Sequence, residues 1–123
     1  MALITITEPQ QIAGLLDLVH DWWFDVEKIS HDQSTGTATL FFAAKQKELF
    51  SSSGKGVVLK INSVRKIEIK DTERVGYYDL NEISYNAASK TLKITGGVPI
   101  EINFITDGLN IEASRSDAPQ VNQ

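Results

Sequence analysis

The stretch that decides the fold is QIAGLLDLVHDWWFDV, residues 11–26. Four apolar residues recur at the spacing of a buried helix face: Ile12, Leu15, Leu16 and Val19. Leu18 and Trp22 widen that face. We expect the helix to begin near Pro9, with Thr7 as N-cap and Gln10 as its capping-box partner. Because almost everything after this stretch has the pattern of strands, the helix must form one wall of the core.

Strand patterns fill most of the remaining chain. Trp23–His31 alternates imperfectly, which indicates a strand with a bulge near Glu27-Lys28. A turn then leads into a return strand over Thr37–Ala44. Val57–Lys70 has the pattern of one long strand, and the parity of its apolar residues predicts a bend at Ser63–Arg65.

Turn signals predict the register of four further strands, which begin at Tyr77. A loop over Ala87–Lys90 sets Tyr85 opposite Leu92 and Ile83 opposite Ile94. A loop over Gly96–Val98 sets Ile94 opposite Ile100 and Leu92 opposite Ile102. A tight turn at Asp107-Gly108 sets Phe104 opposite Ile111. The residues between these apolar ones are polar, so we expect one face of the sheet to be buried and the other to face solvent. The polar positions are Ser84, Lys93, Thr95, Glu101, Asn103, Asn110 and Glu112.

The sequence therefore predicts an α+β fold, with one N-terminal helix packed on a strongly bent antiparallel sheet that ends in a four-stranded meander. A flat sheet of this size cannot be covered by one helix, so we expect it to curl into a partial barrel or to be covered by a second copy. With 123 residues, 41% of them hydrophobic, the chain can build one core. We expect a single domain over residues 1–113 and a frayed tail over residues 114–123.

Composition narrows the class of protein. There is no cysteine, the first basic residue is Lys28, and no apolar run is long enough to span a membrane. We therefore expect a cytoplasmic protein that has no membrane association. The net charge of −4 argues against nucleic acid as a partner. Residues 45–74 hold eight basic and four acidic residues, so this segment is +4 and the rest of the chain is −8.

Acidic residues crowd around the end of the predicted helix: Asp17, Asp21, Asp25 and Glu27. Negative charge near a helix C-terminus is unfavourable, and a local rule that is broken without visible compensation points to function. One interpretation is an acidic surface for a basic partner. The other is a solvated helix face that keeps the protein soluble.

Trp22 and Trp23 lie beside these acids. If Trp22 ends the helix and Trp23 opens a strand, the two rings point in different directions. One of them could then anchor a partner, although both could equally belong to the core.

Two His-Asp pairs, His20-Asp21 and His31-Asp32, could serve a metal or acid–base chemistry. The HD phosphohydrolases use such a dipeptide, but they are all-helical and need further His and Asp ligands on other helices. This chain has only two histidines and its pattern is mostly that of strands, so the resemblance fails. We favour structural roles for both histidines and expect no metal and no cofactor. The phosphate-binding, zinc-protease, serine-hydrolase and calcium-loop motifs are absent from the sequence.

The first third of the chain resembles a pattern in small bacterial domains, some of which are grouped with the immunity proteins of toxin systems. The residues that carry the resemblance are Leu15-Leu16, His20-Asp21, Phe24, Val26, Ile29, Leu40 and Phe42; the repeated His31-Asp32 is not part of it. Immunity-type proteins bind and occlude a toxin. The resemblance implies a binding module without catalytic residues and does not name its partner.

We accordingly expect a non-enzymatic protein-binding module, of the immunity-like kind that the resemblance implies, which presents a surface to a basic protein. The residues of that surface are Asp17, Asp21, Trp22, Trp23, Asp25 and Glu27. The alternative is a small-ligand-binding protein or enzyme with a pocket between helix and sheet, near His20, His31, Tyr77 and Tyr78. A third hypothesis is a homodimer, because Phe41 and Ile105 fall on otherwise polar strand faces.

Overall fold

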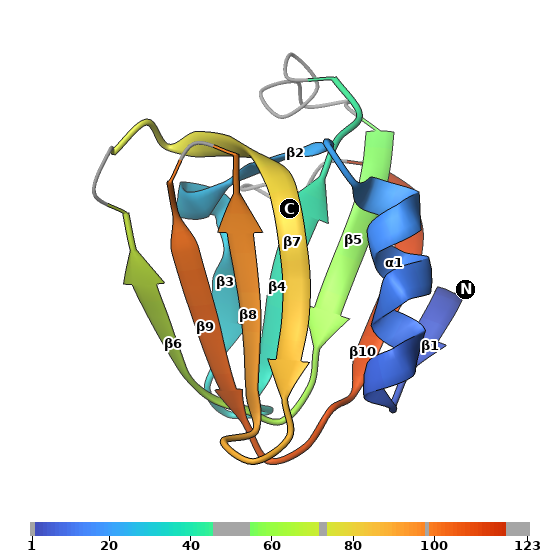
Figure 1. Ribbon diagram of the computed structural model, residues 1–123, viewed down its shortest axis with the longest axis vertical. Coiled ribbons are helices and arrows are strands. Elements are labelled where there is room, and N and C mark those ends of the chain that lie inside the picture. The colour runs from blue at the N-terminus through green and yellow to red at the C-terminus, as the bar shows by residue number, and fades with distance from the viewer. Residues whose placement is uncertain (1, 46–54, 72–73, 98, 118–123) are drawn as a thin grey trace.

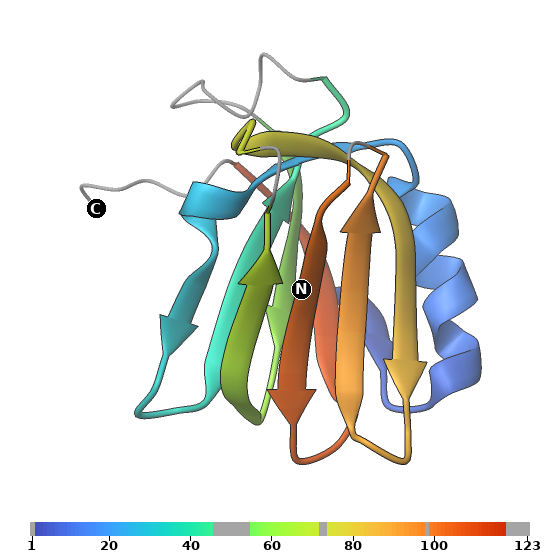
Figure 2. The ribbon, with the colours of Figure 1, turned by 60° about the vertical axis from the view of Figure 1, so that its left-hand side comes forward.

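The computed structural model describes residues 2–45, 55–71, 74–97 and 99–117. They form one N-terminal helix and two five-stranded antiparallel sheets, one of which curls into a half-barrel (Figures 1 and 2). The expected α+β class, with a helix on a bent antiparallel sheet, is confirmed.

The helix begins with a 3-10 turn over Pro9–Gln11 and continues as α1, Ile12–Val19. Its N-cap is Glu8 rather than Thr7, because the Oε1 of Gln11 accepts the N–H groups of Thr7 and Glu8 at 2.8 and 3.0 Å. Gln10 instead donates to the carboxylate of Glu8. Among the described residues, no helix has the length and apolar character needed to cross a bilayer.

Each sheet collects strands that are distant in sequence. In order across the first sheet, these are β1 (Ala2–Ile6), β10 (Ile111–Asp117), β5 (Lys55–Ile61), β4 (Thr37–Phe42) and β3 (Ser30–Asp32). Across the second, they are β2 (Trp23–Asp25), β7 (Tyr77–Asn86), β8 (Thr91–Gly96), β9 (Glu101–Thr106) and β6 (Val64–Lys70). In both ribbon views α1 flanks β7, the strand beside the short β2 (Figures 1 and 2).

Apolar side chains from both sheets and the helix share one core. The rings of Phe24, Phe42 and Tyr78 lie in it with no exposed surface, and α1 contributes Leu15 and Val19. Burying a side chain of this size stabilises the fold by about 1.5–3 kcal/mol. A second, smaller cluster holds Phe41 and Ala43, with Trp23, Val58 and Tyr77 packed against it. Because Phe41 is buried within its own chain, it no longer supports a homodimer.

Two segments that were predicted as continuous strands are each divided between the sheets. The Trp23–His31 segment does not contain a bulge; a 3-10 turn over Val26–Lys28 breaks it into β2 and β3. Val57–Lys70 breaks into β5 and β6 within the predicted bend, where Ser63 has a φ of 59°. The positions of the breaks were predicted correctly, but each break transfers the chain to the other sheet.

The loop predictions had mixed outcomes. The Ala87–Lys90 register is confirmed, with Tyr85 opposite Leu92 and Ile83 opposite Ile94. Across the next turn Ile94 pairs with Ile102, not Ile100, a shift of two residues that keeps the same face buried.

The Asp107-Gly108 hairpin is wrong, because β10 pairs with β1 and β5 rather than with β9. Neither Asp107 nor Gly108 has the positive φ that a two-residue turn of that type requires. The final meander therefore has three strands, β7–β8–β9. Residues 114–117, which were expected to belong to a frayed tail, are part of β10, which continues through Asp117. The rest of the expected tail, residues 118–123, lies outside the described part of the chain.

Candidate functional site

The structure divides the acidic cluster that the sequence predicts. Asp17 and Asp21 are exposed near the end of α1. Asp25 is only 8% exposed, and its Oδ1 accepts the Glu27 N–H at 2.9 Å, which caps the 3-10 turn. Glu27 is exposed, but it lies on that turn beside Gly76. Asp25 is therefore removed from the expected surface, and Glu27 is separated from the helix.

Asp21 has a structural role that the sequence did not reveal. It follows the helix with a φ of 67°, a conformation that Asp and Asn tolerate better than most residues, and its N–H donates to the Leu80 carbonyl at 3.1 Å. Its Oδ2 lies 3.2 Å from Nδ1 of His20. The Asp21 side chain is nevertheless 75% exposed, so it can also face a partner.

Trp22 and Trp23 point to different clusters, as expected. Trp22 packs against the main core, whereas Trp23 packs on the smaller cluster, 6.2 Å from the Tyr77 ring centre. The main chain of Trp23 also exchanges two hydrogen bonds with Ala43, at 2.7 and 2.9 Å, which join the two sheets. Both rings are half-buried, so each supports the fold.

The pocket expected near His20, His31, Tyr77 and Tyr78 is not assembled. Tyr78 is fully buried, and its hydroxyl donates to Asp71 Oδ1 and accepts the Val75 N–H. His31 lies on β3, where its Nε2–H donates to the Val64 carbonyl at 3.0 Å. His20 ends the helix and Tyr77 packs on the smaller cluster, and none of the four residues lines either of the two hollows described below.

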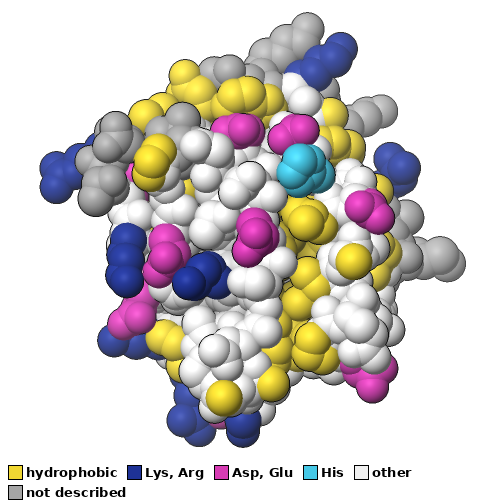
Figure 3. Space-filling view, viewed as in Figure 1, with side chains coloured by type: hydrophobic (Ala, Val, Ile, Leu, Met, Phe, Trp, Pro, Cys, Tyr) yellow, Lys and Arg dark blue, Asp and Glu magenta, His cyan; other side chains and the backbone are white. Residues whose placement is uncertain are grey.

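A groove does lie between helix and sheet, but other residues form it. Strand β2 pairs with β7 only over Tyr77–Asp79, and beyond that point α1 takes its place beside β7. The groove between them has a volume of about 450 Å³ and is lined mainly by apolar atoms. Its lining consists of Pro9, Gln10, Ile12, Ala13, Leu16, Glu82, Ile83, Ser84 and Tyr85. In Figure 3 it is a hydrophobic strip that runs along the boundary between α1 and β7.

Acidic side chains border this groove, and its lining holds no Lys or Arg. Glu82 lies in the wall formed by β7. On the helix, Asp17 stands four residues after Ala13 and therefore lies on the same helix face. Asp21 follows the C-terminal end of α1, where its main-chain N–H donates to the Leu80 carbonyl of β7. Figure 3 shows several acidic side chains around this part of the surface. We call Asp17, Asp21 and Glu82 the acidic rim.

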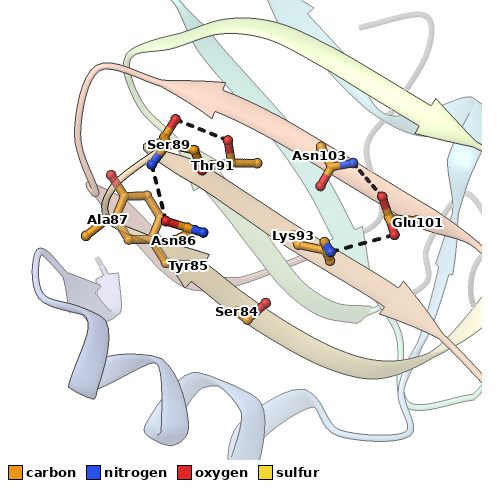
Figure 4. Close-up of a pocket in the computed structure, with 9 residues that line it drawn as sticks. All are labelled: Ser84, Tyr85, Asn86, Ala87, Ser89, Thr91, Lys93, Glu101 and Asn103. Carbon is orange, nitrogen blue, oxygen red and sulfur yellow. Dashed lines mark hydrogen bonds and ion pairs between the residues drawn. The ribbon is translucent and has the colours of Figure 1, made fainter.

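A second hollow, polar and about 600 Å³ in volume, lies on the outer face of β7–β8–β9 (Figure 4). Its lining is Ser84, Tyr85, Asn86, Ala87, Ser89, Thr91, Lys93, Glu101 and Asn103. Asn103 is 8% exposed and donates from Nδ2 to Glu101 Oε2 at 2.8 Å. That hydrogen bond, with support from Lys70 and Lys93, lowers the pKa of Glu101 below its ordinary value. The alternation of polar and apolar residues predicts that this face is exposed to solvent, but it does not predict that the face is hollowed.

A metal ion in a protein is held by several side chains together. In the described ranges, no three His, Cys, Asp or Glu side chains gather as metal ligands would. Comparison with known proteins gives no further guide, because no family model, no curated protein and no solved structure matches the chain.

Proposed function

We propose that this protein is a non-enzymatic protein-binding module that docks a basic segment of another protein in the groove between α1 and β7. The observation that supports the proposal is the combination of an apolar groove with an acidic rim. The rim includes Asp17, whose exposed carboxylate makes no hydrogen bond or ion pair with any residue that the structure describes. Unpaired negative charge beside exposed apolar surface suits a positively charged, partly apolar partner.

Binding would combine two kinds of contact. Apolar side chains of the partner would enter the groove against the half-buried Leu16 and Tyr85 and lose their contact with water. Lys or Arg side chains beside them would face Asp17, Asp21 and Glu82, which favours rapid encounter and disfavours acidic competitors. This is steric and electrostatic occlusion, the way in which an immunity-type protein neutralises a toxin.

The experiment is an affinity capture from the native host, with the full chain as bait. It is followed by binding measurements on the purified partner at low and high salt. The test variant is Asp17→Asn/Glu82→Gln, which neutralises both walls of the groove and leaves the backbone at Asp21 unchanged. At about 0.5–1 kcal/mol for each charge, binding should weaken roughly five- to thirty-fold. Higher ionic strength should weaken binding of the unmodified protein in the same direction.

The matched control is Glu27→Gln/Glu112→Gln, which removes two exposed negative charges away from the groove. It should leave binding within about twofold of the unmodified protein. Equal losses in the two variants would show that only net charge matters. No loss in either, or a captured partner that is acidic, would refute the proposal.

The polar hollow favours a second candidate function, recognition of a small polar ligand. Lys93, Glu101 and Asn103 offer both donors and acceptors at one end, and Ser89 and Thr91 lie at the other (Figure 4). A neutral ligand rich in hydroxyl groups, such as a sugar, would suit this mixture. Chemical shift changes confined to these residues on titration with a panel of sugars would support it, and an unchanged spectrum at millimolar ligand would exclude it.

A further inference from the structure

Strand β6, Val64–Lys70, forms the end of its sheet that lies away from α1. Among the described strands only β9 pairs with it, and both ribbon views show it at the border of the β7–β8–β9 layer (Figures 1 and 2). From Arg65 to Lys70 its residues are exposed except for the half-buried Ile67. The Ile69 side chain is 43% exposed, unusual for a large apolar residue in this fold. The strand therefore presents apolar side chains next to an edge without a partner.

The hydrogen-bond pattern shows which main-chain groups face this edge. The Thr106 N–H donates to the Lys90 carbonyl and the Gly96 N–H to the Ile100 carbonyl, so the even-numbered residues of β8 and β9 bond to each other. The odd-numbered residues of β9 consequently face β6, where Asn103 pairs with Glu68 and Glu101 with Lys70.

It follows that Ile67 and Ile69 direct their N–H and C=O groups away from the sheet, where no described strand pairs with them. The start of the strand is different. The N–H of Val64 donates to the Gly36 carbonyl at 2.6 Å, and its carbonyl accepts from His31. The open edge is therefore the stretch from Arg65 to Lys70.

We propose that β6 pairs antiparallel with β6 of a second copy of this chain, with Ile67 opposite Ile67 across a two-fold axis. Within one chain, Lys66 Nζ lies 3.2 Å from Glu68 Oε2, and both side chains stay largely exposed. In this register Lys66 also lies opposite Glu68 of the second copy, and the symmetry makes the same contact twice, so the four charges alternate in sign. The two Ile67 residues, whose main-chain groups point outward, form the central hydrogen-bonded pair. Arg65, whose Nε lies 2.6 Å from Asp107 Oδ1 of its own chain, lies opposite Ile69. Its side chain is 71% exposed, so its aliphatic part can cover the exposed apolar surface of Ile69 while the ion pair is kept.

The neighbouring registers fit less well. A shift of one residue sets Glu68 opposite Glu68 and Lys66 opposite Lys70, which places like charges together three times. With Ile69 on the axis, Ile67 would lie opposite Asp71, whose carboxylate already accepts hydrogen bonds from Tyr78 and the Arg74 N–H. The lysines of β6 thus make pairing with most strands unfavourable, but they are compatible with the antiparallel pairing that sets Ile67 opposite Ile67.

The test is sedimentation equilibrium of the full chain over a range of concentrations. A single pair of edges buries little area, so a dimer with a dissociation constant of roughly 0.1–1 mM is expected. Lys66→Glu alone and Glu68→Lys alone should each be monomeric in this range, because each sets like charges opposite one another in its own dimer. An equimolar mixture of the two variants should dimerise again, because opposite charges then meet at both contacts.

The mixture separates association from folding, since each variant must be folded to restore the dimer. A chain that stays monomeric at about 1 mM, a dimer that both variants retain, or a mixture that stays monomeric would each overturn the proposal. The edge of β6 and the groove beside α1 lie at opposite ends of the sheet. Partner binding and self-association can therefore be lost independently.

Discussion

The two ends of the β2-β7-β8-β9-β6 sheet differ in almost every respect. At the α1 end, Leu15 and Val19 cover the sheet and are fully buried, and the main chain of Leu80 is bonded to Asp21 and Trp22. At the β6 end, Ile69 is 43% exposed and no described strand pairs with the outer edge. The first end carries an acidic rim, and the second carries Arg65, Lys66 and Lys70.

If the groove and the β6 edge bind partners as we propose, the difference means that one sheet separates stability from recognition. Substitutions in the helix face should affect folding first, because the buried core depends on those residues. Substitutions on β6 should affect association and leave folding almost unchanged. The acidic rim stands between these cases, since Asp21 also supports the backbone.

The largest contrast is expected from truncating one apolar side chain at each end. Leu15→Ala should lower the free energy of unfolding by about 2–5 kcal/mol, because it opens a cavity in the main core. Ile69→Ala should cost less than about 1 kcal/mol, because the side chain already contacts solvent. Urea unfolding at micromolar protein, where β6 pairing is negligible, measures both. Equal losses would contradict the comparison.

The next largest effect is expected at the hydrogen bond between Tyr78 and Asp71, which links the two ends of the sheet. Asp71, just after β6, accepts the hydroxyl of Tyr78 on β7. Tyr78→Phe should lower the free energy of unfolding by about 1–3 kcal/mol, because it removes a buried hydrogen bond to a carboxylate. Urea unfolding of the variant at neutral pH measures the loss. No loss would mean that this contact does not hold the ends together.

The same tyrosine predicts a dependence on pH. Burial first, and then the hydrogen bond to Asp71, raise the pKa of Tyr78 above its ordinary value. The folded state therefore binds this proton more tightly than the unfolded state. Its contribution is complete below the unfolded-state pKa of about 10 and is lost as pH rises through the folded-state pKa. Unfolding curves above pH 10 should show this decline, and Tyr78→Phe should reduce it; an identical decline in the variant would refute the assignment.

A smaller change should strengthen the α1 end alone. Gly14 lies in α1, and an added Cβ would meet no atom within 4 Å. Gly14→Ala should therefore raise the free energy of unfolding by up to about 1 kcal/mol through helix propensity. Thermal unfolding measures the gain. A destabilised variant would mean that this face of the helix is more crowded than the structure shows.

The smallest effect separates the charge of Asp21 from its backbone role. Asp21→Asn keeps a side chain suited to positive φ and should change stability by only a few tenths of a kcal/mol. Asp21→Lys should be less stable than Asp17→Lys by up to about 1 kcal/mol, because only Asp21 has left-handed backbone. Parallel urea titrations compare them, and equal stabilities would remove the backbone role.

Local pattern predicted the strands and their faces better than it predicted their partners. The Ala87–Lys90 hairpin was predicted correctly, because a short loop sets the register of the two strands that it joins. The hairpin predicted at Asp107-Gly108 was wrong, because no local pattern shows that β10 pairs with β5 and not with β9. The breaks near Glu27 and Ser63 were visible as changes in parity, but the transfer to another sheet depends on distant strands.

The site was predicted only in part for the same reason. Crowding of acids in sequence identified Asp17 and Asp21, yet Asp25 turned inward to cap a turn that the pattern did not predict. Glu82 joins the rim from a strand sixty residues later, and no local signal links it to the helix. The polar hollow depends on the curvature of the sheet, which residue alternation does not encode.

The central claim is that a partner occupies the groove between α1 and β7, and methyl NMR tests it most directly. Methyl groups report on both ends of the sheet: Ile12 and Ile83 in the groove, Ile67 and Ile69 on β6. On titration with the captured partner, the account predicts shifts of Ile12 and Ile83 and constant positions for Ile67 and Ile69. Shifts confined to Ile67 and Ile69, or to residues around the polar hollow, would contradict it.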